Sequence, residues 1–208
     1  MDEPSFVQLL EAITSPQNEA RNAAEQRFEQ LKNSDPVFTM HALVELCARG
    51  AHSVQMISLI LLRKMFATNV DVFDKAPADV KAAIMEKTLV VFANAAHDRQ
   101  QAKSAAALVA ALAVKIIKLD GSWDELWTNL FATILNPGSS SEHKAACCDV
   151  LAHTATVVAT SYIRDHPQEV ATGLLNCLKD PETVTKLASI NAVQQIIGMI
   201  AADRISLF

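Results

Sequence analysis

One recurrent pattern strongly constrains what this 208-residue chain can fold into. Five segments begin with a long polar residue, with a small residue three places later and an apolar residue seven places later. The first positions are Arg21, Gln55, Lys103, Lys144 and Lys186. The small residues are Ala24, Ser58, Ala106, Cys147 and Ser189, and the apolar residues are Phe28, Leu62, Ala110, Leu151 and Val193. Each copy predicts a helix with one close-packing face, because positions three, four and seven apart share a face.

Successive copies begin 34, 48, 41 and 42 residues apart. A recurrence near forty residues, in a sequence with no strand pattern, is typical of a solenoid of two-helix HEAT-type repeats. We therefore predict an all-α fold in which about five helical hairpins form a right-handed superhelical array. Short links indicate that successive helices run antiparallel. The predicted hairpins span residues 4–32, 36–68, 77–119, 123–162 and 167–204.

The sequence contains no flexible linker, so residues 1–208 are expected to form one continuous array. Solenoids usually finish with a polar capping repeat, whereas this chain finishes with the apolar residues 205–208. We therefore expect the amino-terminal part of a longer solenoid; the alternative is a natural end that folds back onto the fifth hairpin. The longest link, residues 69–76, carries Val70, Val72 and Phe73, which are expected to pack between hairpins two and three.

Composition limits the partners and the compartment. A net charge of −5 argues against nucleic acid as the main ligand and is compatible with basic protein partners. Four irregularly spaced cysteines without a secretory signal favour a reducing compartment. The longest apolar run, Ala105–Val114, is too short to span a bilayer and ends at Lys115, so no membrane insertion is predicted.

No catalytic arrangement stands out, and the chain is expected to be neither an enzyme nor a cofactor-binding protein. His143 and Cys147 have the spacing of a metal pair on a helix, but no second pair follows. Because Cys147 occupies the small position of its repeat, a packing role is favoured over a metal role. Cys47 and Cys177 are also interpreted as core residues.

The first positions of the recurrence have two interpretations. Structurally, a long polar side chain at one register can reach acidic or carbonyl groups of the next hairpin and form a ladder. Functionally, an exposed member can meet an acidic partner. The structural interpretation is preferred, because stacking requires a residue at a fixed register. The five candidate ladder residues are Arg21, Gln55, Lys103, Lys144 and Lys186.

Several segments resemble the karyopherin-β (importin-β) family. Leu10–Pro16 followed by Arg21–Glu25, with Phe28 and Leu31, is similar to the family's first repeat. Leu59–Phe66 is similar to its second repeat. Phe73–Lys81 resembles the approach to a third repeat, and Trp123 fits the start of a fourth. In detail the chain is most similar to the importin beta-3 (importin-5) branch, as an amino-terminal fragment.

The resemblance implies a nuclear import receptor that shuttles between cytoplasm and nucleus. Such receptors bind GTP-loaded Ran along the inner helices of their first repeats and release import cargo when Ran binds. FG nucleoporins and cargo are expected mostly on repeats beyond this chain. The Ran-contact candidates implied by position are Arg21, Glu25, Glu29, Gln55, Arg63, Arg99 and Lys103. Gln55 departs from the basic residue that related sequences place there.

A second function stays open beside this one. The solenoid pattern alone is equally compatible with a HEAT-repeat scaffold subunit of a phosphatase-type or kinase-type complex. Ran binding and co-purification of an enzyme subunit distinguish the two hypotheses.

Overall fold

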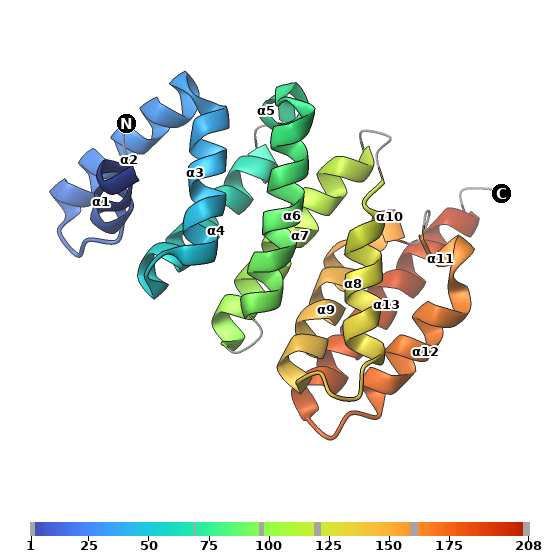
Figure 1. Cartoon of the computed structure of the whole chain (residues 1–208). Coiled ribbons are helices and arrows are strands. Elements are labelled where there is room, and N and C mark those ends of the chain that lie inside the picture. The colour runs from blue at the N-terminus through green and yellow to red at the C-terminus, as the bar shows by residue number, and fades with distance from the viewer. Residues whose placement is uncertain (1–2, 69, 96–97, 119–121, 159–161, 206–208) are drawn as a thin grey trace. The chain divides into compact units, whose positions relative to one another are not determined.

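A computed structural model describes residues 3–68, 70–95, 98–118, 122–158 and 162–205 (Figure 1). Within these ranges the regular structure consists of thirteen α-helices and no strand. The regular structure is therefore entirely helical, and the all-α solenoid prediction is confirmed. The chain divides into two compact units, residues 1–91 and 92–208. The continuity of one array across this division stays a prediction.

Unit 1 holds the first two hairpins and the helix after them. Helices α1 and α2 pack on each other as hairpin one, and α3 and α4 as hairpin two. Their bounds are α1 (Glu3–Ile13), α2 (Asn18–Ser34), α3 (Pro36–Arg49) and α4 (His52–Thr68), followed by α5 (Val70–Lys75) and α6 (Ala78–Asn94).

Helix α3 shows how local sequence sets these elements. The Asp35 carboxylate accepts a hydrogen bond from the Phe38 amide at 3.1 Å and caps the helix. Pro36 occupies the first helical position, where a missing N–H breaks no hydrogen bond. Inside the helix, Met40, Leu43 and Cys47 recur every three or four residues and are all buried.

The link after α4 is more ordered than the sequence predicted, because it contains the six-residue helix α5. Phe73 is buried and its ring meets Phe66 edge-on at 5.9 Å. Lys81 donates a hydrogen bond to the Asp74 carbonyl at 2.7 Å, and its ammonium group lies 5.9 Å from the centre of the Phe73 ring. These tertiary contacts, which local spacing does not reveal, stabilise the turn of helix.

Unit 2 holds the remaining helices. Helix α9 lies between α7 and α13 and packs against both, while α12 packs against α8 and α13 (Figure 1). Their bounds are α7 (Arg99–Lys118), α8 (Asp124–Leu135), α9 (Ser141–His153), α10 (Ala155–Val158), α11 (Tyr162–Asp165), α12 (Pro167–Leu178) and α13 (Thr183–Ile205). Residues 206–208, part of the expected apolar end, lie outside the described residues.

The second helix of the predicted hairpin over residues 123–162 is interrupted, because α9 ends at His153. The buried Thr154 hydroxyl donates a hydrogen bond to the Val150 carbonyl at 2.7 Å. Such back-bonding competes with the helix, and Thr156 and Val157 are β-branched residues that favour helices less. The chain therefore continues as two short helices, α10 and α11, before hairpin five.

The small positions of the recurrence are all buried, as close helix packing requires. They are Ala24, Ser58, Ala106, Cys147 and Ser189. A further close approach lies between α12 and α8 at Gly173. A Cβ atom at Gly173 would lie 3.0 Å from the Ile134 Cγ2 atom and 3.3 Å from the Phe131 ring. Only glycine lets these two helices approach so closely.

Helix α7 is long and apolar enough over Arg99–Ile117 to cross a membrane by length and composition alone. More than half of this segment is buried inside the structure. Ala105, Ala106, Val109 and Leu112 form part of the core of unit 2. Packing against α9 therefore explains the apolar character of α7.

A buried polar cluster joins hairpins four and five. The Asp180 carboxylate accepts hydrogen bonds from the Ser141 hydroxyl at 2.7 Å and from the Glu182 amide at 3.0 Å. The Lys144 ammonium lies 3.6 Å from the same carboxylate, and the side chains of Lys144 and Asp180 are 14% and 4% exposed. Burial alone would raise the pKa of Asp180. The hydrogen bonds and the Lys144 charge outweigh burial and hold that pKa below its usual value.

We predict that Asp180→Asn lowers the free energy of unfolding at pH 7 by about 1–3 kcal/mol, because Lys144 loses its counter-charge. The folded pKa of Asp180 lies below the unfolded value of about 3.9, so its charge stabilises the fold above that pH. The stabilisation is lost as pH falls through the folded pKa. The difference between wild type and variant in urea unfolding should therefore shrink below about pH 4. The exposed Asp165→Asn is the control, and an equal loss in both variants would contradict the prediction.

Two serines at the same position of the recurrence provide a second prediction. The Ser189 hydroxyl donates to the Leu174 carbonyl at 2.9 Å, whereas the buried Ser58 hydroxyl has no hydrogen-bond partner among the described residues. Ser58→Ala should raise the free energy of unfolding by about 0.5–1 kcal/mol, since it removes an unsatisfied hydroxyl and favours the helix. Ser189→Ala should lower it by about 1 kcal/mol. Thermal unfolding of both variants checks the pair, and the same sign in both would refute it.

Candidate partner-binding surface

In unit 1 the first candidate residues occupy successive turns of α2. Glu25 and Glu29 are exposed, and Arg21 is half-buried. Arg21 donates a hydrogen bond from Nη2 to the Asn18 side chain at 2.6 Å. Glu29 forms an ion pair with Lys32 in the next turn. Of the three candidates on this helix, Glu25 is therefore the one that forms neither of these contacts.

The second helix of hairpin two places the next two candidates two turns apart on α4. Arg63 is exposed, whereas Gln55 is half-buried. Leu59 lies four residues from each of them, on the same side of α4, and is buried. The two candidate positions therefore lie at the edge of the core. Gln55 is thereby less available to a partner than Arg63.

In unit 2 the candidates Arg99 and Lys103 lie one turn apart at the start of α7, and both are exposed. The Asp98 side chain caps this helix by accepting from the Gln101 amide at 2.8 Å. Asp149, on α9, is half-buried. Burial raises the pKa of Asp149, while Lys103, His153 and Arg99 act in the opposite direction. The two basic residues thus act on one partly desolvated carboxylate.

The candidate ladder residues have different surroundings. Lys144 reaches from hairpin four to Asp180, in the link between the two helices of hairpin five, as a ladder residue should. Arg21 instead bonds within its own helix, to Asn18. Lys186 is half-buried, and Lys103 is exposed beside Asp149. The ladder role of the set as a whole stays a prediction.

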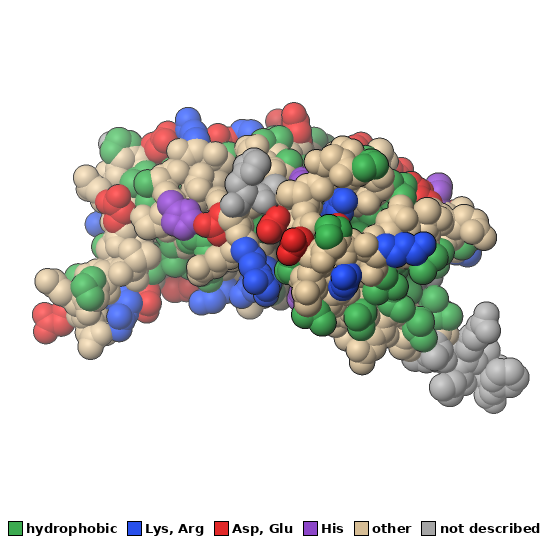
Figure 2. Space-filling view, turned by 90° about the horizontal axis from the view of Figure 1, so that it is seen from below, with side chains coloured by type: hydrophobic (Ala, Val, Ile, Leu, Met, Phe, Trp, Pro, Cys, Tyr) green, Lys and Arg blue, Asp and Glu red, His purple; other side chains and the backbone are tan. Residues whose placement is uncertain are grey.

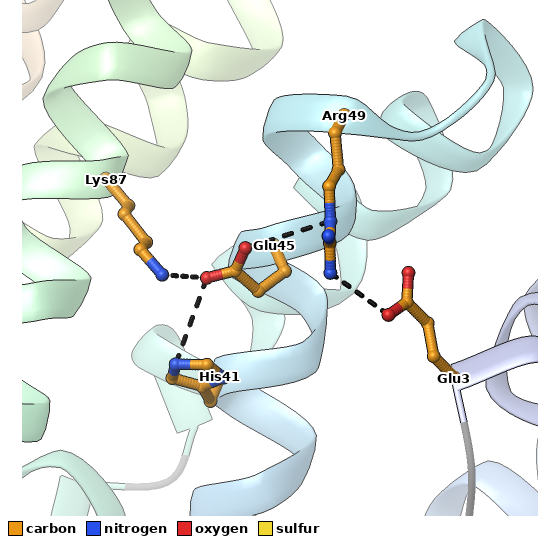
Figure 3. A network of polar contacts seen from close by, with 5 residues as sticks. All are labelled: Glu3, His41, Glu45, Arg49 and Lys87. Carbon is orange, nitrogen blue, oxygen red and sulfur yellow. Dashed lines mark hydrogen bonds and ion pairs between the residues drawn. The ribbon is translucent and has the colours of Figure 1, made fainter.

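Sequence reasoning missed a polar network in unit 1, drawn in Figure 3. Glu45 lies at its centre and forms ion pairs with Lys87 of α6 and with Arg49 at 3.8 Å, and its carboxylate lies 3.9 Å from the His41 ring nitrogen Nε2. Arg49 also donates to Glu3 of α1 at 3.1 Å. The spacing of four residues from His41 to Glu45 to Arg49 predicts the contacts within α3. The contacts to α1 and α6 depend on the tertiary fold.

This network borders a pocket of about 240 Å³ between α1 and α3. Phe6, Phe38 and Leu46 form its apolar part, and the two rings meet edge-on at 6.1 Å. Glu3 and Arg49 lie at the pocket and pair with each other. Chemically, such a site can receive an apolar side chain beneath a charged rim.

The cysteines are packing residues in the structure. Cys47, Cys147 and Cys177 are all buried, as the packing interpretation predicts. Burial raises the pKa of the Cys47 thiol to about 12 and raises that of Cys147 as well, which disfavours the nucleophilic thiolate. His143 meets the Phe92 ring edge-on at 5.5 Å. Among the described residues, no group of three metal-ligating side chains lies close enough to hold a metal ion.

No protein-family model matches the chain. A solved structure of yeast importin-beta (Kap95p) matches with a TM-score of 0.81 and 17% identity, covering 97% of this chain and 25% of that protein. Kap121p matches with a TM-score of 0.78 and 16% identity, covering 93% and 18%. Kap121p bound to RanGTP matches with a TM-score of 0.74 and 17% identity, covering 93% and 17%. The chain spans a quarter or less of the length of these solved proteins. Its fold is similar to that of HEAT-repeat segments of these karyopherins.

Proposed function

We propose that this chain is part of a karyopherin-type nuclear transport receptor and binds GTP-loaded Ran through α2, α4 and α7. The observation that carries the proposal is the fold match over 93% of the chain to Kap121p bound to RanGTP. The resemblance of the first two hairpins to karyopherin-β repeats supports it from the sequence.

The candidate contacts can be ranked by whether each charged side chain is exposed and forms an ion pair. Arg63, Arg99 and Lys103 are exposed, and none of them forms an ion pair with another described residue. A partner's carboxylate can meet such a side chain without first breaking an ion pair. Arg21 and Glu29 would have to leave Asn18 and Lys32. We therefore place the strongest ionic contacts at Arg63, Arg99 and Lys103, with Glu25 as an acidic member of the surface.

The same proposal extends to the whole protein. The receptor would carry protein cargo into the nucleus, contact FG nucleoporins, shuttle through the nuclear pore and supply these hairpins from its amino-terminal end. Solved complexes of Kap95 with Nup1 and of Kap121p with Ulp1p support these partner classes by their fold similarity. Assignment to the importin beta-3 branch has only the sequence resemblance in its support.

The scaffold hypothesis shares the solenoid fold but has no observation of its own in its favour. The matched structures described above are karyopherins, which favours transport. A partner test separates the two functions: a scaffold subunit should retain a kinase or phosphatase subunit and be indifferent to Ran.

We predict that the purified chain binds Ran loaded with a non-hydrolysable GTP analogue more tightly than GDP-loaded Ran. Isothermal titration calorimetry with both nucleotide states checks this. The scaffold hypothesis would be favoured if the chain bound both forms of Ran equally or not at all and also retained a phosphatase or kinase subunit. Testing the full-length protein in parallel shows whether repeats outside this chain complete the site.

We further predict that Arg63→Glu with Lys103→Glu weakens Ran-GTP binding about tenfold or more, since two surface charge pairs become repulsive. The matched control is Arg164→Glu with Lys179→Glu, which changes the net charge equally at exposed positions outside the candidate set. The loss should also diminish at high salt, where surface charges are screened. Similar affinities of the two double variants would remove Arg63 and Lys103 from the contact.

A further inference from the structure

Helix α13 of unit 2 carries a row of exposed side chains along one side. Leu187, Ile190, Gln194 and Ile197 follow one another at intervals of three, four and three residues, which places them on one face of the helix. The three apolar side chains are 61%, 51% and 60% exposed, and Gln194 is exposed as well. Figure 2 shows apolar side chains gathered on the part of unit 2 that lies toward the carboxyl terminus. We call these four residues the α13 seam, because two helices pack along this spacing in a coiled coil.

The repeat register indicates what packs on this side of a second helix. On α9, Ala145 and Cys148 stand one and four places after Lys144, and both are buried. Hairpin five covers this side of α9, because α13 packs along α9 and Cys148 lies beside Cys177 of α12. On α13 the first two seam residues stand at the same two intervals after Lys186, but they are exposed. The α13 seam thus continues the stacking of second helices, and another helix is the element that fits it.

The absence of charge on α13 restricts which helix can lie on the seam. The sequence of this helix has no charged residue between Lys186 and Asp203. The cores of protein interfaces are likewise depleted of charge, because a charge that is buried without a partner loses its hydration. Among the described residues, the other exposed large apolar side chains lie one to a helix: Ile60, Val90, Leu135 and Leu175. Within this chain, the surface that matches the α13 seam is therefore α13 itself.

We infer that two copies of this chain associate through their α13 seams, with the two helices antiparallel and related by a two-fold axis. The intervals of three, four and three read the same in both directions, so Leu187 meets the partner's Ile197 and Ile190 meets the partner's Gln194. An antiparallel pair also places the two Lys186 ammonium groups at opposite ends of the seam, whereas a parallel pair would bring these like charges together. This interaction surface goes beyond the proposed Ran contact, because α13 carries none of the Ran-contact candidates.

Sedimentation velocity over a range of protein concentrations tests the contact. One helix packed on one helix lies at the small end of interface sizes, so we expect the chain to dimerise with a dissociation constant of about 10–100 μM. Ile190→Glu should weaken dimerisation about tenfold or more, because the contact would bury a carboxylate without a partner. The matched control is Leu175→Glu on α12, because Leu175 is 53% exposed, much as Ile190 is, but lies outside the seam.

The control variant should dimerise as the wild type does, and circular dichroism checks that both variants remain folded. A wild-type chain that stays monomeric at about 200 μM would overturn the inference. An equal effect of Ile190→Glu and Leu175→Glu would overturn it as well.

A mixture of two variants tests the antiparallel register. Leu187→Glu and Ile197→Lys should each be monomeric alone, because each would bury a charge without a partner. In an equimolar mixture they should form a heterodimer, since the antiparallel pair places the new carboxylate opposite the new ammonium group and keeps the other end of the seam apolar. The control mixture, Leu187→Glu with Ile190→Lys, should stay monomeric, because these two positions do not lie opposite each other. The same behaviour in both mixtures would overturn the assigned contact.

The outcomes separate this inference from the Ran proposal. Ile190→Glu should bind Ran-GTP as the wild type does, because α13 lies outside the candidate Ran contact. If the chain ignores Ran but the two seam variants restore each other's dimerisation, the α13 contact stands and the Ran proposal falls. A full-length protein that is monomeric at the concentrations where this chain dimerises would assign the seam to a further hairpin of the array. That result would overturn the contact between two copies.

Discussion

The fold depends on the close approach of neighbouring second helices. In unit 2 this approach occurs where α9 packs against α7 and α13, with Ala106, Cys147 and Ser189 buried at one register of the recurrence. A larger side chain at these positions would force the helices apart or leave its rotamer wells, because protein interiors are packed as densely as organic crystals. The small residues therefore fix the register of every other side chain on the same helices. Lys144 reaches Asp180 because it precedes Cys147 by three residues at this fixed register.

Because the helices pack closely, the stability of the fold depends on whether each buried polar group has a hydrogen-bond partner. Asp180 is buried, but its carboxylate has two hydrogen bonds and an adjacent ammonium group, so its charge is retained. Ser58 is equally buried without a partner among the described residues, although it stands at the same register as Ser189. The register alone therefore determines burial, and the neighbouring helix determines whether a buried hydroxyl contributes favourably. Such local differences make a repetitive fold energetically uneven along its length.

Features encoded within one helix could be predicted from the sequence, and features that depend on contacts between helices could not. The recurrence indicated the hairpins, because its positions lie within a few residues of each other, and the Asp35 cap is a local feature of the same kind. The break at Thr154 was missed because a threonine hydroxyl competes with the helix only in some contexts. Within the candidate surface, the sequence placed Gln55 and Arg63 on the same helix. It did not indicate that Gln55 is half-buried whereas Arg63 is exposed. The partner of Glu45 on α6 and the partner of Arg49 on α1 required the tertiary fold.

A solenoid binds through its surface, so the availability of each charge matters more than the number of charges. Glu45 is surrounded by Lys87, Arg49 and His41, so a partner that engaged any of them would first have to break a native ion pair. Arg63, Arg99 and Lys103 have no such pair among the described residues, and their ordering entropy has not been lost before binding. Exposed charges of this kind gain little when isolated, but a partner that buries them beside apolar groups removes water from both. Binding energy is therefore expected where exposed charges that form no ion pair border apolar surface.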